Sequence, residues 1–538
     1  LYDLFVLYTD NKYKQAHSSE IRKALKISVI DIGSNTIKLV NYNVKRDLSF
    51  TAFQQESTKV KLGESLDRTH ILSDQSIERA IDTLLLYRDI IRVESIKRCL
   101  CVGTSAIREA QNSAHFVDQV YKRTGFKIKI LSGKEEAYYS YLGASMSSYL
   151  PNALFFDLGG GSLELVYTED FKIKKVDSLP LGALRLTQIY GKKDSSFSKK
   201  DCDDMIQKIN DSLPTRRSYA IGIDTVLAGV GGTLRTLTKY DQGYTGYPLE
   251  KIHNYRLKLT AIETMCKELG SMNDKEISGL RAMDATRAET IVAGSYVIHT
   301  LMKKLEFEEV IVSAYGLREG VIAGFLRNRD FFNYQKSEDL GKQIPKIVSN
   351  NYEPNIQNIE LDNILRHMIS YGFLKEREVE ILSFAIQTLA KLHATNKLYG
   401  LFYMILDEDY PYLTHREQLV LALAIVQSKK AKTSDWLYSK YRSIMKPQNQ
   451  KSIQKIGILL KLNDLIVKSR SRIKLRESKN NGIVIDISSA IRSYPDILFQ
   501  NIIQRVSEVF GIMIECYLPN NLDRPIHTEN GMITVRSK

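Results

Sequence analysis

One pattern occurs twice in this chain, and it constrains the fold more than any other feature. ISVIDIGSNTIKLVN (27–41) and ALFFDLGGGSLELVY (153–167) each contain an apolar run that ends in Asp, a glycine-rich turn with Ser, and a second, amphipathic run. The runs predict β-strands and the turns predict hairpins. Asp31 and Asp157 lie 126 residues apart, which indicates a duplicated domain rather than a solenoid repeat.

Both turns have the composition of a phosphate-binding loop. Backbone N–H groups of a glycine-rich turn converge on one point, Ser and Asn add donors, and the Asp can orient water or hold a divalent cation. An ordinary hairpin turn explains one copy, whereas two copies favour a phosphate held from both sides. A third glycine-rich turn, in LAGVGGTLRTL (227–237), begins a predicted helix whose N-terminus favours an anion. The predicted phosphate-binding residues are Ser34, Asn35, Gly159, Gly160, Ser162, Gly231, Gly232 and Thr233.

Hydrolysis of a phosphoanhydride also needs a base for the attacking water. Glu136, in SGKEEA (132–137), lies in the first turn of a predicted helix, and Glu164 follows the second glycine-rich loop. Either carboxylate can accept a proton from water, although each is also compatible with a solvated surface position. Arg108, in GTSAIRE (103–109), follows a predicted strand that runs into a loop, where its guanidinium can neutralise a phosphate.

Seven motifs together resemble the Ppx/GppA exopolyphosphatase and guanosine pentaphosphate phosphatase family. In chain order, from about residue 27 to residue 325, they are VIDIGSNTIKLV, GTSAIREA, ILSGKEEAYYSYLGA, FFDLGGGSLELV, LPLGALRL, AGVGGTLRTL and SAYGLREG. The resemblance implies an α/β fold with two ribonuclease-H-like lobes, as in actin, Hsp70 and sugar kinases. It also implies an active site in the cleft between the lobes.

The resemblance further implies roles for individual residues. Asp157 would hold Mg²⁺ and water, Glu136 would be the first candidate for the general base, and Glu164 the second. Arg108 would bind the phosphate chain, and a monovalent cation such as K⁺ is a further expected cofactor. The glycine-rich loops would hold the terminal phosphate. Two positions differ from the family pattern: Lys38 stands where Arg or His is expected, and Glu289 where Asp is usual.

Composition shifts and motifs divide the chain into five predicted segments. They are an N-terminal extension (1–25), lobe I (26–150), lobe II (151–327), a helical HD-like domain (328–440) and a basic α+β domain (441–538). An active HD site needs a His-Asp pair, but His367, His393 and His415 are not followed by Asp. The helical domain is therefore expected to be degenerate, without a second metal site.

The formal net charge is +14, and much of the excess is local. Between Lys440 and Lys479 there are twelve Lys and Arg against Asp464 and Glu477. Such an excess favours a polyanionic partner, although a solvated surface is the simpler interpretation. Family members with these extra domains are dimers with a polyanion-binding groove, which the resemblance implies here too. The residues assigned to that groove are Lys468, Arg470, Arg472, Lys474 and Arg476.

Two absences in the sequence narrow the class of protein. The five cysteines form no CxxC pair, which argues against a disulfide scaffold or a thiolate zinc site and favours a cytoplasmic location. No run of 18 apolar residues occurs, so no membrane association is expected, and no specific nucleic-acid partner is expected either.

The predicted function is that of an exopolyphosphatase, which releases orthophosphate from the end of a polyphosphate chain. The alternative is a guanosine pentaphosphate (pppGpp) 5′-phosphohydrolase, which would use the same loops, and the basic stretch favours polyphosphate. Direct attack by water is expected because the motifs contain no His or Cys nucleophile. An actin-like phosphotransferase and a non-catalytic polyanion-binding protein are the other classes considered.

Overall fold

The computed structural model describes most of the chain, which divides into two compact units, Leu1–Asn351 and Tyr352–Lys538. The described ranges are 25–45, 48–192, 194–327, 359–391, 398–410, 413–477, 483–489, 496–512, 514–517, 526–527 and 534–535. The predicted N-terminal extension (1–25) therefore lies outside the described residues, apart from Leu25.

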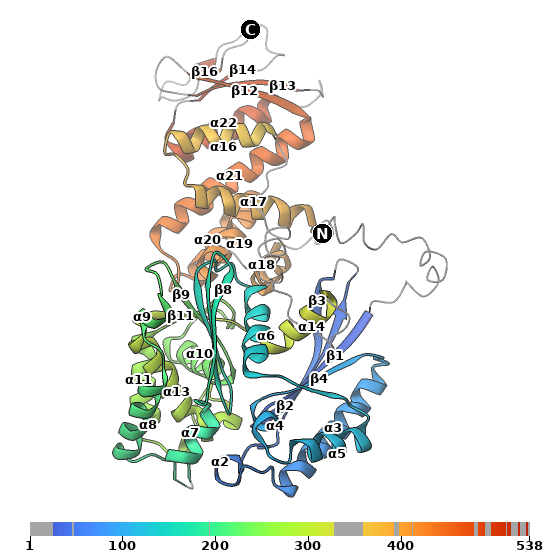
Figure 1. The fold of residues 1–538 in the computed structure, drawn as a ribbon. Helices are drawn as coiled ribbons and strands as arrows, with labels where there is room; N and C mark the ends of the chain where they lie inside the picture. The colour runs from blue at the N-terminus through green and yellow to red at the C-terminus, as the bar shows by residue number, and fades with distance from the viewer. Residues whose placement is uncertain are drawn as a thin grey trace, which may run out of the picture. The chain divides into compact units, whose positions relative to one another are not determined.

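Figure 1 shows the first lobe in blue to teal. It is built on a five-stranded sheet in the order β3-β2-β1-β4-β5. Its strands are β1 (Leu25–Ile32), β2 (Thr36–Val44), β3 (Phe50–Lys59), β4 (Cys99–Gly103) and β5 (Ile128–Ile130). Strands β1 and β2 form the predicted hairpin, β3 pairs antiparallel with β2, and β4 and β5 continue the sheet in parallel. Helices α3 (Asp74–Val93) and α5 (Ser113–Thr124) cover one face, where their apolar side chains meet those of β1 and β2 in one core.

The second lobe repeats this arrangement, which confirms the duplication. Its sheet has the order β8-β7-β6-β9-β11-β10, so β6, β7 and β8 take the places of β1, β2 and β3. The strands are β6 (Ala153–Leu158), β7 (Leu163–Glu169), β8 (Lys172–Leu179), β9 (Val226–Val230), β10 (Arg256–Lys258) and β11 (Glu309–Val312). The helices that contribute to its core include α7 (Ala183–Tyr190), α8 (Lys199–Ser212), α10 (Gly232–Thr245), α11 (Leu259–Leu269) and α13 (Ala288–Lys304).

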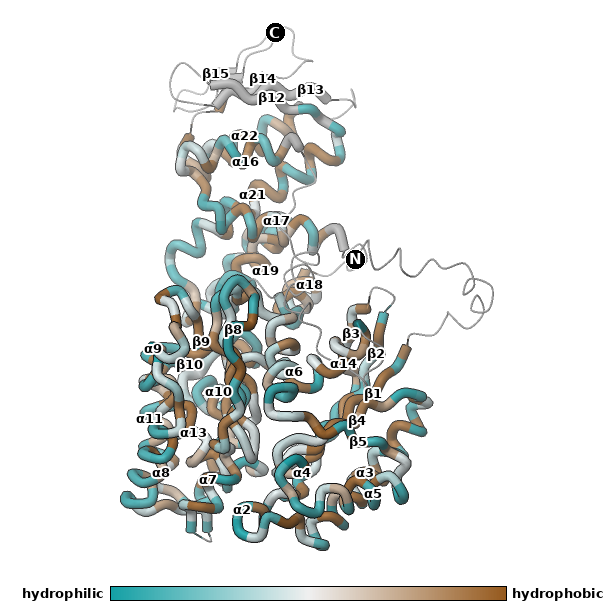
Figure 2. The backbone as a smooth tube through the Cα atoms, viewed as in Figure 1, coloured by the Kyte–Doolittle hydropathy of each residue, from teal (hydrophilic) through white to brown (hydrophobic). Residues whose placement is uncertain are grey.

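The pattern of hydropathy explains these layers. Figure 2 shows apolar residues along the central strands and alternating apolar and polar residues along outer helices such as α3. In β1 the residues from Ile27 to Ile30 are all buried, as expected for a strand covered on both faces. One local expectation was wrong: GTSAIRE continues from β4 into a short helix, α4 (Ser105–Glu109), rather than into a loop, because Ala106 and Ile107 pack into the lobe I core.

Two helices join the lobes by packing against the opposite sheet. Helix α6 (Gly133–Ser145) lies against β6, β7 and β8 of lobe II, whereas α14 (Leu317–Arg327) lies against β1 of lobe I and against α6. They cross with their backbones in contact. A Cβ atom on Gly143 would overlap the carbonyl oxygen of Gly316, and one on Gly320 would overlap the carbonyl oxygen of Tyr139. Only glycine permits this approach.

This crossing gives a stability prediction. We expect Gly143→Ala to lower the free energy of unfolding of the first unit by about 3 kcal/mol, because backbone atoms cannot move aside as a flexible side chain can. Urea unfolding monitored by circular dichroism measures the change. The control is Gly222→Ala, where an added Cβ meets only the Thr225 hydroxyl at 3.7 Å. Equal stability of the two variants would contradict the proposed close contact.

The second unit is a helical body followed by a small mixed sheet. Its helices are α16 (Ile359–Ser370), α17 (Glu376–Lys391), α18 (Leu398–Asp407), α19 (His415–Lys429), α20 (Ala431–Lys440), α21 (Pro447–Ser469) and α22 (Asp496–Phe510). The strands, β12 (Ser471–Glu477), β13 (Ile483–Ser489), β14 (Ile514–Tyr517), β15 (Ile526–His527) and β16 (Thr534–Val535), follow the order β12-β13-β14-β16-β15. Helix α21, beyond the predicted boundary at 440, packs against α17 and α19.

Several cations of the basic stretch are already engaged inside the second unit. The Lys440 ammonium donates to the Tyr403 hydroxyl at 3.0 Å, that of Lys455 to the Phe373 carbonyl at 2.6 Å, and Lys468 pairs with Asp464 at 2.6 Å. Arg470 and Arg472 are exposed. Lys474 and Arg476 belong to β12, but their side chains lie outside the described residues.

Two expectations about metals and membranes concern the whole chain. Among the described residues, no group of three or more His, Cys, Asp or Glu side chains is arranged as a metal site. His367 and His415 lie on α16 and α19, and His393 falls outside the described residues. Within the described residues, every helix is too short or too polar to cross a bilayer.

Candidate active site

A cavity between the two lobes collects most of the residues that the motifs predict. It encloses about 790 Å³, including its open mouth, and both lobes line it. The lining comes from the turn after β1, the start of α4, the first turn of α6, the loop after β6, the start of α10 and the segment that precedes α14. Of the predicted residues, the structure brings together Ser34, Asn35, Glu136, Asp157, Gly159, Gly160, Gly231 and Gly232 at this cavity.

The glycine-rich loops of the two lobes touch each other at one side of the cavity. The hydroxyls of Ser34 and Ser105, both in lobe I, lie 2.9 Å apart. A Cβ atom on Gly161 of lobe II would collide with the Ser105 hydroxyl. The loops therefore meet only because this position lacks a side chain, and a phosphate in the cavity is within reach of donors from both lobes.

Three carboxylates line the cavity, from three different elements. Asp31 and Asp157 end the equivalent strands β1 and β6, and Glu136 lies in the first turn of α6. The Ser140 hydroxyl donates to Asp157 Oδ2 at 2.6 Å. Because Ser140 is one helical turn after Glu136, α6 presents both side chains on one face: the Glu136 carboxylate and the Ser140 hydroxyl that binds Asp157. Sequence reasoning missed Ser140, although this spacing was the signal for it.

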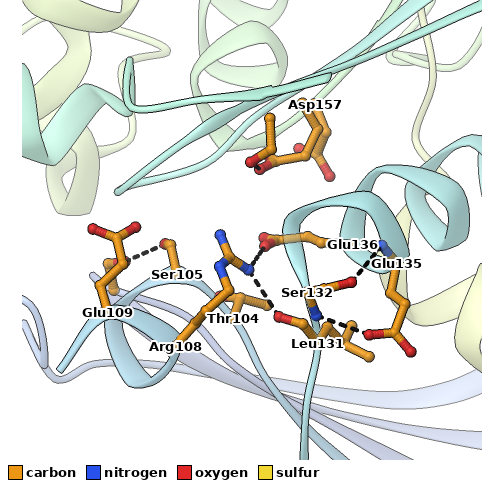
Figure 3. Close-up of polar contacts among 12 residues, drawn as sticks. Thr104, Ser105, Arg108, Glu109, Leu131, Ser132, Glu135, Glu136 and Asp157 are labelled. Atoms are coloured by element: carbon orange, nitrogen blue, oxygen red, sulfur yellow. Dashed lines mark hydrogen bonds and ion pairs between the residues drawn. The ribbon is translucent and has the colours of Figure 1, made fainter. Parts of the chain in front are cut away.

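Glu136 occupies an environment that tunes its acidity. Helix α6 begins with a capping box in which Ser132 and Glu135 satisfy the first backbone N–H groups, and this fixes the direction of the next residue. Arg108 donates to Glu136 Oε2 at 2.8 Å and to the Leu131 carbonyl at 2.9 Å, as Figure 3 shows. Burial raises the pKa of Glu136 to about 7, against the opposing effect of Arg108. A carboxylate with this pKa can both accept and release a proton near neutral pH.

This environment predicts the pH dependence of the reaction. If Glu136 must be deprotonated to act, kcat/KM rises as the pH increases through about 7. Arg108→Ala removes the cation that favours the ionised form, so we expect the acidic limb to move toward higher pH by about one unit. Steady-state kinetics from pH 5.5 to 9 measure the limb. An unmoved limb in Arg108→Ala would show that another group controls it.

Glu164 lies behind the cavity rather than on its surface. It faces Asp157 across the β6–β7 pair and, with Ser140, lines a small separate pocket. Ser178 donates to Glu164 Oε1 at 2.9 Å. Burial and the nearby charge of Glu136 raise the pKa of Glu164 well above its usual value. Burial favours the neutral form of Glu164, and this residue does not line the cavity, which favours Glu136 of the two candidates.

Four cations of the cavity lining form the largest group that sequence reasoning left unassigned. They are Lys38, Arg235, Arg287 and Arg318, on β2, α10, the turn before α13, and α14. Burial, followed by the charge of Arg318, lowers the pKa of Lys38 to about 7. Burial also lowers the pKa of Arg235, to about 10. Half-buried cations so close together repel one another, so the lining suits an anion with several charges.

The remaining predicted residues lie outside the cavity lining. Arg108 is not among the lining residues but is bonded to Glu136, as described above. Ser162 and Thr233 are buried, and Thr233 packs against Gly294 of α13. The structure therefore gives Arg108 a contact with the candidate base, and the predicted contact with phosphate stays a prediction.

The donor set fits a magnesium ion. Mg²⁺ in phosphoryl-transfer sites binds through one or two carboxylates and completes its shell with water and substrate phosphate. Asp31 and Asp157 supply two such carboxylates at the cavity. Asn35, which is 4% exposed, also lines it, and neither polar atom of its amide has a hydrogen-bond partner among the described residues. Such a buried amide is a further group for an oxygen-rich ligand.

Comparison with known proteins decides the family. The model of the Ppx/GppA phosphatase family matches residues 42–329, more than half of the chain. The chain belongs to the Ppx/GppA phosphatase family. This confirms the resemblance seen in the motifs. The solved structure of an exopolyphosphatase from Cytophaga hutchinsonii is similar, with a TM-score of 0.52 and 25% identity over 56% of this chain and 98% of that one.

Relatives in this family carry different names. The bifunctional 3-dehydroquinate synthase/phosphatase of Fusobacterium nucleatum is 30% identical over 56% of this chain, and the match spans only 46% of that protein. The guanosine-5'-triphosphate,3'-diphosphate pyrophosphatase of Vibrio atlanticus is 28% identical over 68% of this chain and 71% of its own length. Exopolyphosphatase 1 of Mycobacterium bovis is 25% identical over 55% of this chain and 87% of its own length.

Proposed function

We propose that this protein is an exopolyphosphatase that hydrolyses the terminal phosphoanhydride of inorganic polyphosphate. The observation that carries the proposal is the cavity itself, in which four half-buried cations and a candidate base with a pKa of about 7 face the phosphate loops of both lobes. Relatives named exopolyphosphatase support it. The +14 net charge adds a reason for a long, multiply charged substrate.

In the proposed mechanism, the chain's own residues hold the terminal phosphate and activate water. Backbone N–H groups of the loops at Gly159 and Gly231 bind the terminal phosphoryl oxygens, and Arg287 and Arg318 neutralise the phosphates behind it. Glu136 accepts the proton of the attacking water while Arg108 holds its carboxylate in place. Ser140 fixes Asp157, which with Asp31 would hold Mg²⁺. The ion, when bound, would supply charge neutralisation for the leaving phosphate.

The second candidate is the hydrolysis of pppGpp to the tetraphosphate. One observation favours it: the match to the guanosine-5'-triphosphate,3'-diphosphate pyrophosphatase covers 68% of this chain, more than the first compact unit alone provides. A phosphotransferase is disfavoured, because Glu136 stands at the cavity in position to deprotonate water. The intact carboxylates and cations of the cavity disfavour a purely binding role. Dimer formation and a cytoplasmic location stay predictions.

Removal of the base tests the proposal. We expect Glu136→Gln to lower kcat by about 10²–10⁴-fold, the usual effect of losing a general base, with substrate binding retained. Glu135→Gln is the matched control, because it neutralises the adjacent carboxylate of the same helix turn while Gln can still complete the capping box. Phosphate release from long polyphosphate, tripolyphosphate and pppGpp is measured with Mg²⁺ and with a chelator. Near-normal turnover by Glu136→Gln would refute the mechanism.

The basic stretch gives a separate prediction about long substrates. We expect the joint replacement of Lys468, Arg470, Arg472, Lys474 and Arg476 by Gln to weaken hydrolysis of long polyphosphate, most strongly at low salt, because exposed charges are screened by ions. Tripolyphosphate has only two phosphates beyond the terminal one and should be affected least. KM for both substrates at two salt concentrations measures this. An equal effect on both would show that this stretch does not bind the distal chain.

A further inference from the structure

A second cationic site adjoins the cavity and is occupied by a carboxylate of the protein itself. The Nζ atom of Lys59, at the end of β3, lies 3.0 Å from Glu289 Oε2, and that of Lys61 lies 2.9 Å from Glu289 Oε1. Each carboxylate oxygen therefore has its own lysine. The lysines belong to lobe I and Glu289, at the start of α13, to lobe II. All three side chains keep between a quarter and two fifths of their surface exposed.

This ion triad is continuous with the cavity lining on both sides. Lys59 is the cross-strand partner of Thr36, which lines the cavity, so their side chains share a face of the sheet. The N–H groups of Val60 and Lys61 donate to the Asn35 carbonyl at 3.0 and 2.9 Å. Glu289 is two residues beyond Arg287, whose guanidinium lies against Gly232 in the cavity wall. Lys59 and Lys61 thus extend the row of cations outward from the cavity.

The backbone at Lys61 shows that this position is held in place. Lys61 has φ = 52°, in the left-handed region that a side chain with a Cβ rarely adopts. The conformation is maintained by the two hydrogen bonds to Asn35 and by that from the Gly63 N–H to the Ser34 carbonyl at 2.9 Å. Strain of this kind persists where the surrounding structure fixes it, and it occurs most often at functional sites. Here the loop that carries Lys61 is attached directly to the first phosphate loop.

We propose that Lys59 and Lys61 form a distal phosphate subsite, and that Glu289 is its internal competitor. This inference rests on the proposed function and deepens it. A substrate that extends past the cavity displaces the Glu289 carboxylate and places one of its own phosphates between the two ammonium groups. A short substrate does not reach the lysines, and Glu289 remains paired with them. The triad therefore favours long phosphate chains over short ones.

A simpler role for the triad is that of a latch that keeps the lobes together. Another interlobe cluster shows what a latch looks like: Arg185 of α7 pairs with Asp67 at 2.9 Å and with Glu109, both in lobe I. Neither these three residues nor Lys59, Lys61 and Glu289 are among those that line the cavity, so position alone does not separate a latch from a subsite. The two roles predict different results. Loss of a latch has the same effect whichever partner is removed, whereas loss of a subsite and loss of its competitor have opposite effects.

Four variants separate these roles: Lys59→Ala/Lys61→Ala, Glu289→Gln, Arg185→Gln as the latch control, and Lys122→Ala as a control for an exposed lysine. Lys122 pairs with Asp118 one helical turn away. KM is measured for long polyphosphate and for tripolyphosphate. We expect the double lysine variant to raise the ratio of the long-chain to the tripolyphosphate KM by about tenfold, the size expected for two charged contacts at a partly exposed site. Glu289→Gln should lower this ratio of KM values. Arg185→Gln should not lower it.

Binding of long polyphosphate without turnover keeps the inference independent of catalysis. Titration of each variant in the presence of a chelator should give the same order of affinities, with Glu289→Gln tightest and the double lysine variant weakest. If Glu289→Gln and the double lysine variant both weaken binding, or neither changes it, the subsite does not exist. If the expected order of affinities is found but the wild type hydrolyses neither long polyphosphate, tripolyphosphate nor pppGpp, the proposed function fails and the subsite stands. Circular dichroism confirms that each variant is folded.

Discussion

The crossing of α6 and α14 is the contact on which the active site depends. Their backbones touch at Gly143, Gly316 and Gly320, so neither helix can shift without moving the other. Helix α6 carries Glu136 and Ser140, and α14 begins with Leu317 and Arg318 of the cavity lining. Glu319 is buried beside them, where it accepts from the Tyr42 hydroxyl at 2.6 Å and from the Gly316 N–H at 2.9 Å. The candidate base Glu136, the Ser140 partner of Asp157 and the cation Arg318 are thus positioned by a single junction.

The site also concentrates charges that a stable fold would otherwise avoid. Four cations and three carboxylates line one cavity, and burial shifts the pKa values of Lys38, Arg235, Glu136 and Asp157 toward their neutral forms. Desolvated charges cost free energy unless they are paired. The compensation visible in the structure is local: Ser140 for Asp157 and Arg108 for Glu136. The proposed anionic substrate would offset the repulsion among the cations of this lining.

Features of the site that depend on neighbouring residues could be predicted from the sequence, whereas those that depend on tertiary packing could not. The hairpins around Asp31 and Asp157 depend on neighbouring residues, so alternating apolar residues and glycines sufficed to predict them. Arg235 and Arg318 stand in motifs that were recognised and Arg287 does not, but all three come from separate elements, and only tertiary packing brings them together. Arg108 and Glu164 were predicted as site residues, but neither is among the residues that line the cavity. A sequence pattern identifies the element that carries a side chain more readily than the direction in which it points.

The acidity of Glu136 has a consequence for how the reaction would proceed over time. Phosphoanhydride hydrolysis near neutral pH releases acid, because the new phosphate ends partly dissociate. A base whose pKa is about 7 loses its active form as that acid accumulates. Burial of one carboxylate would therefore link the rate of the enzyme to the buffering capacity around it. In a weakly buffered compartment, rapid breakdown of a long chain would slow itself before the substrate is exhausted.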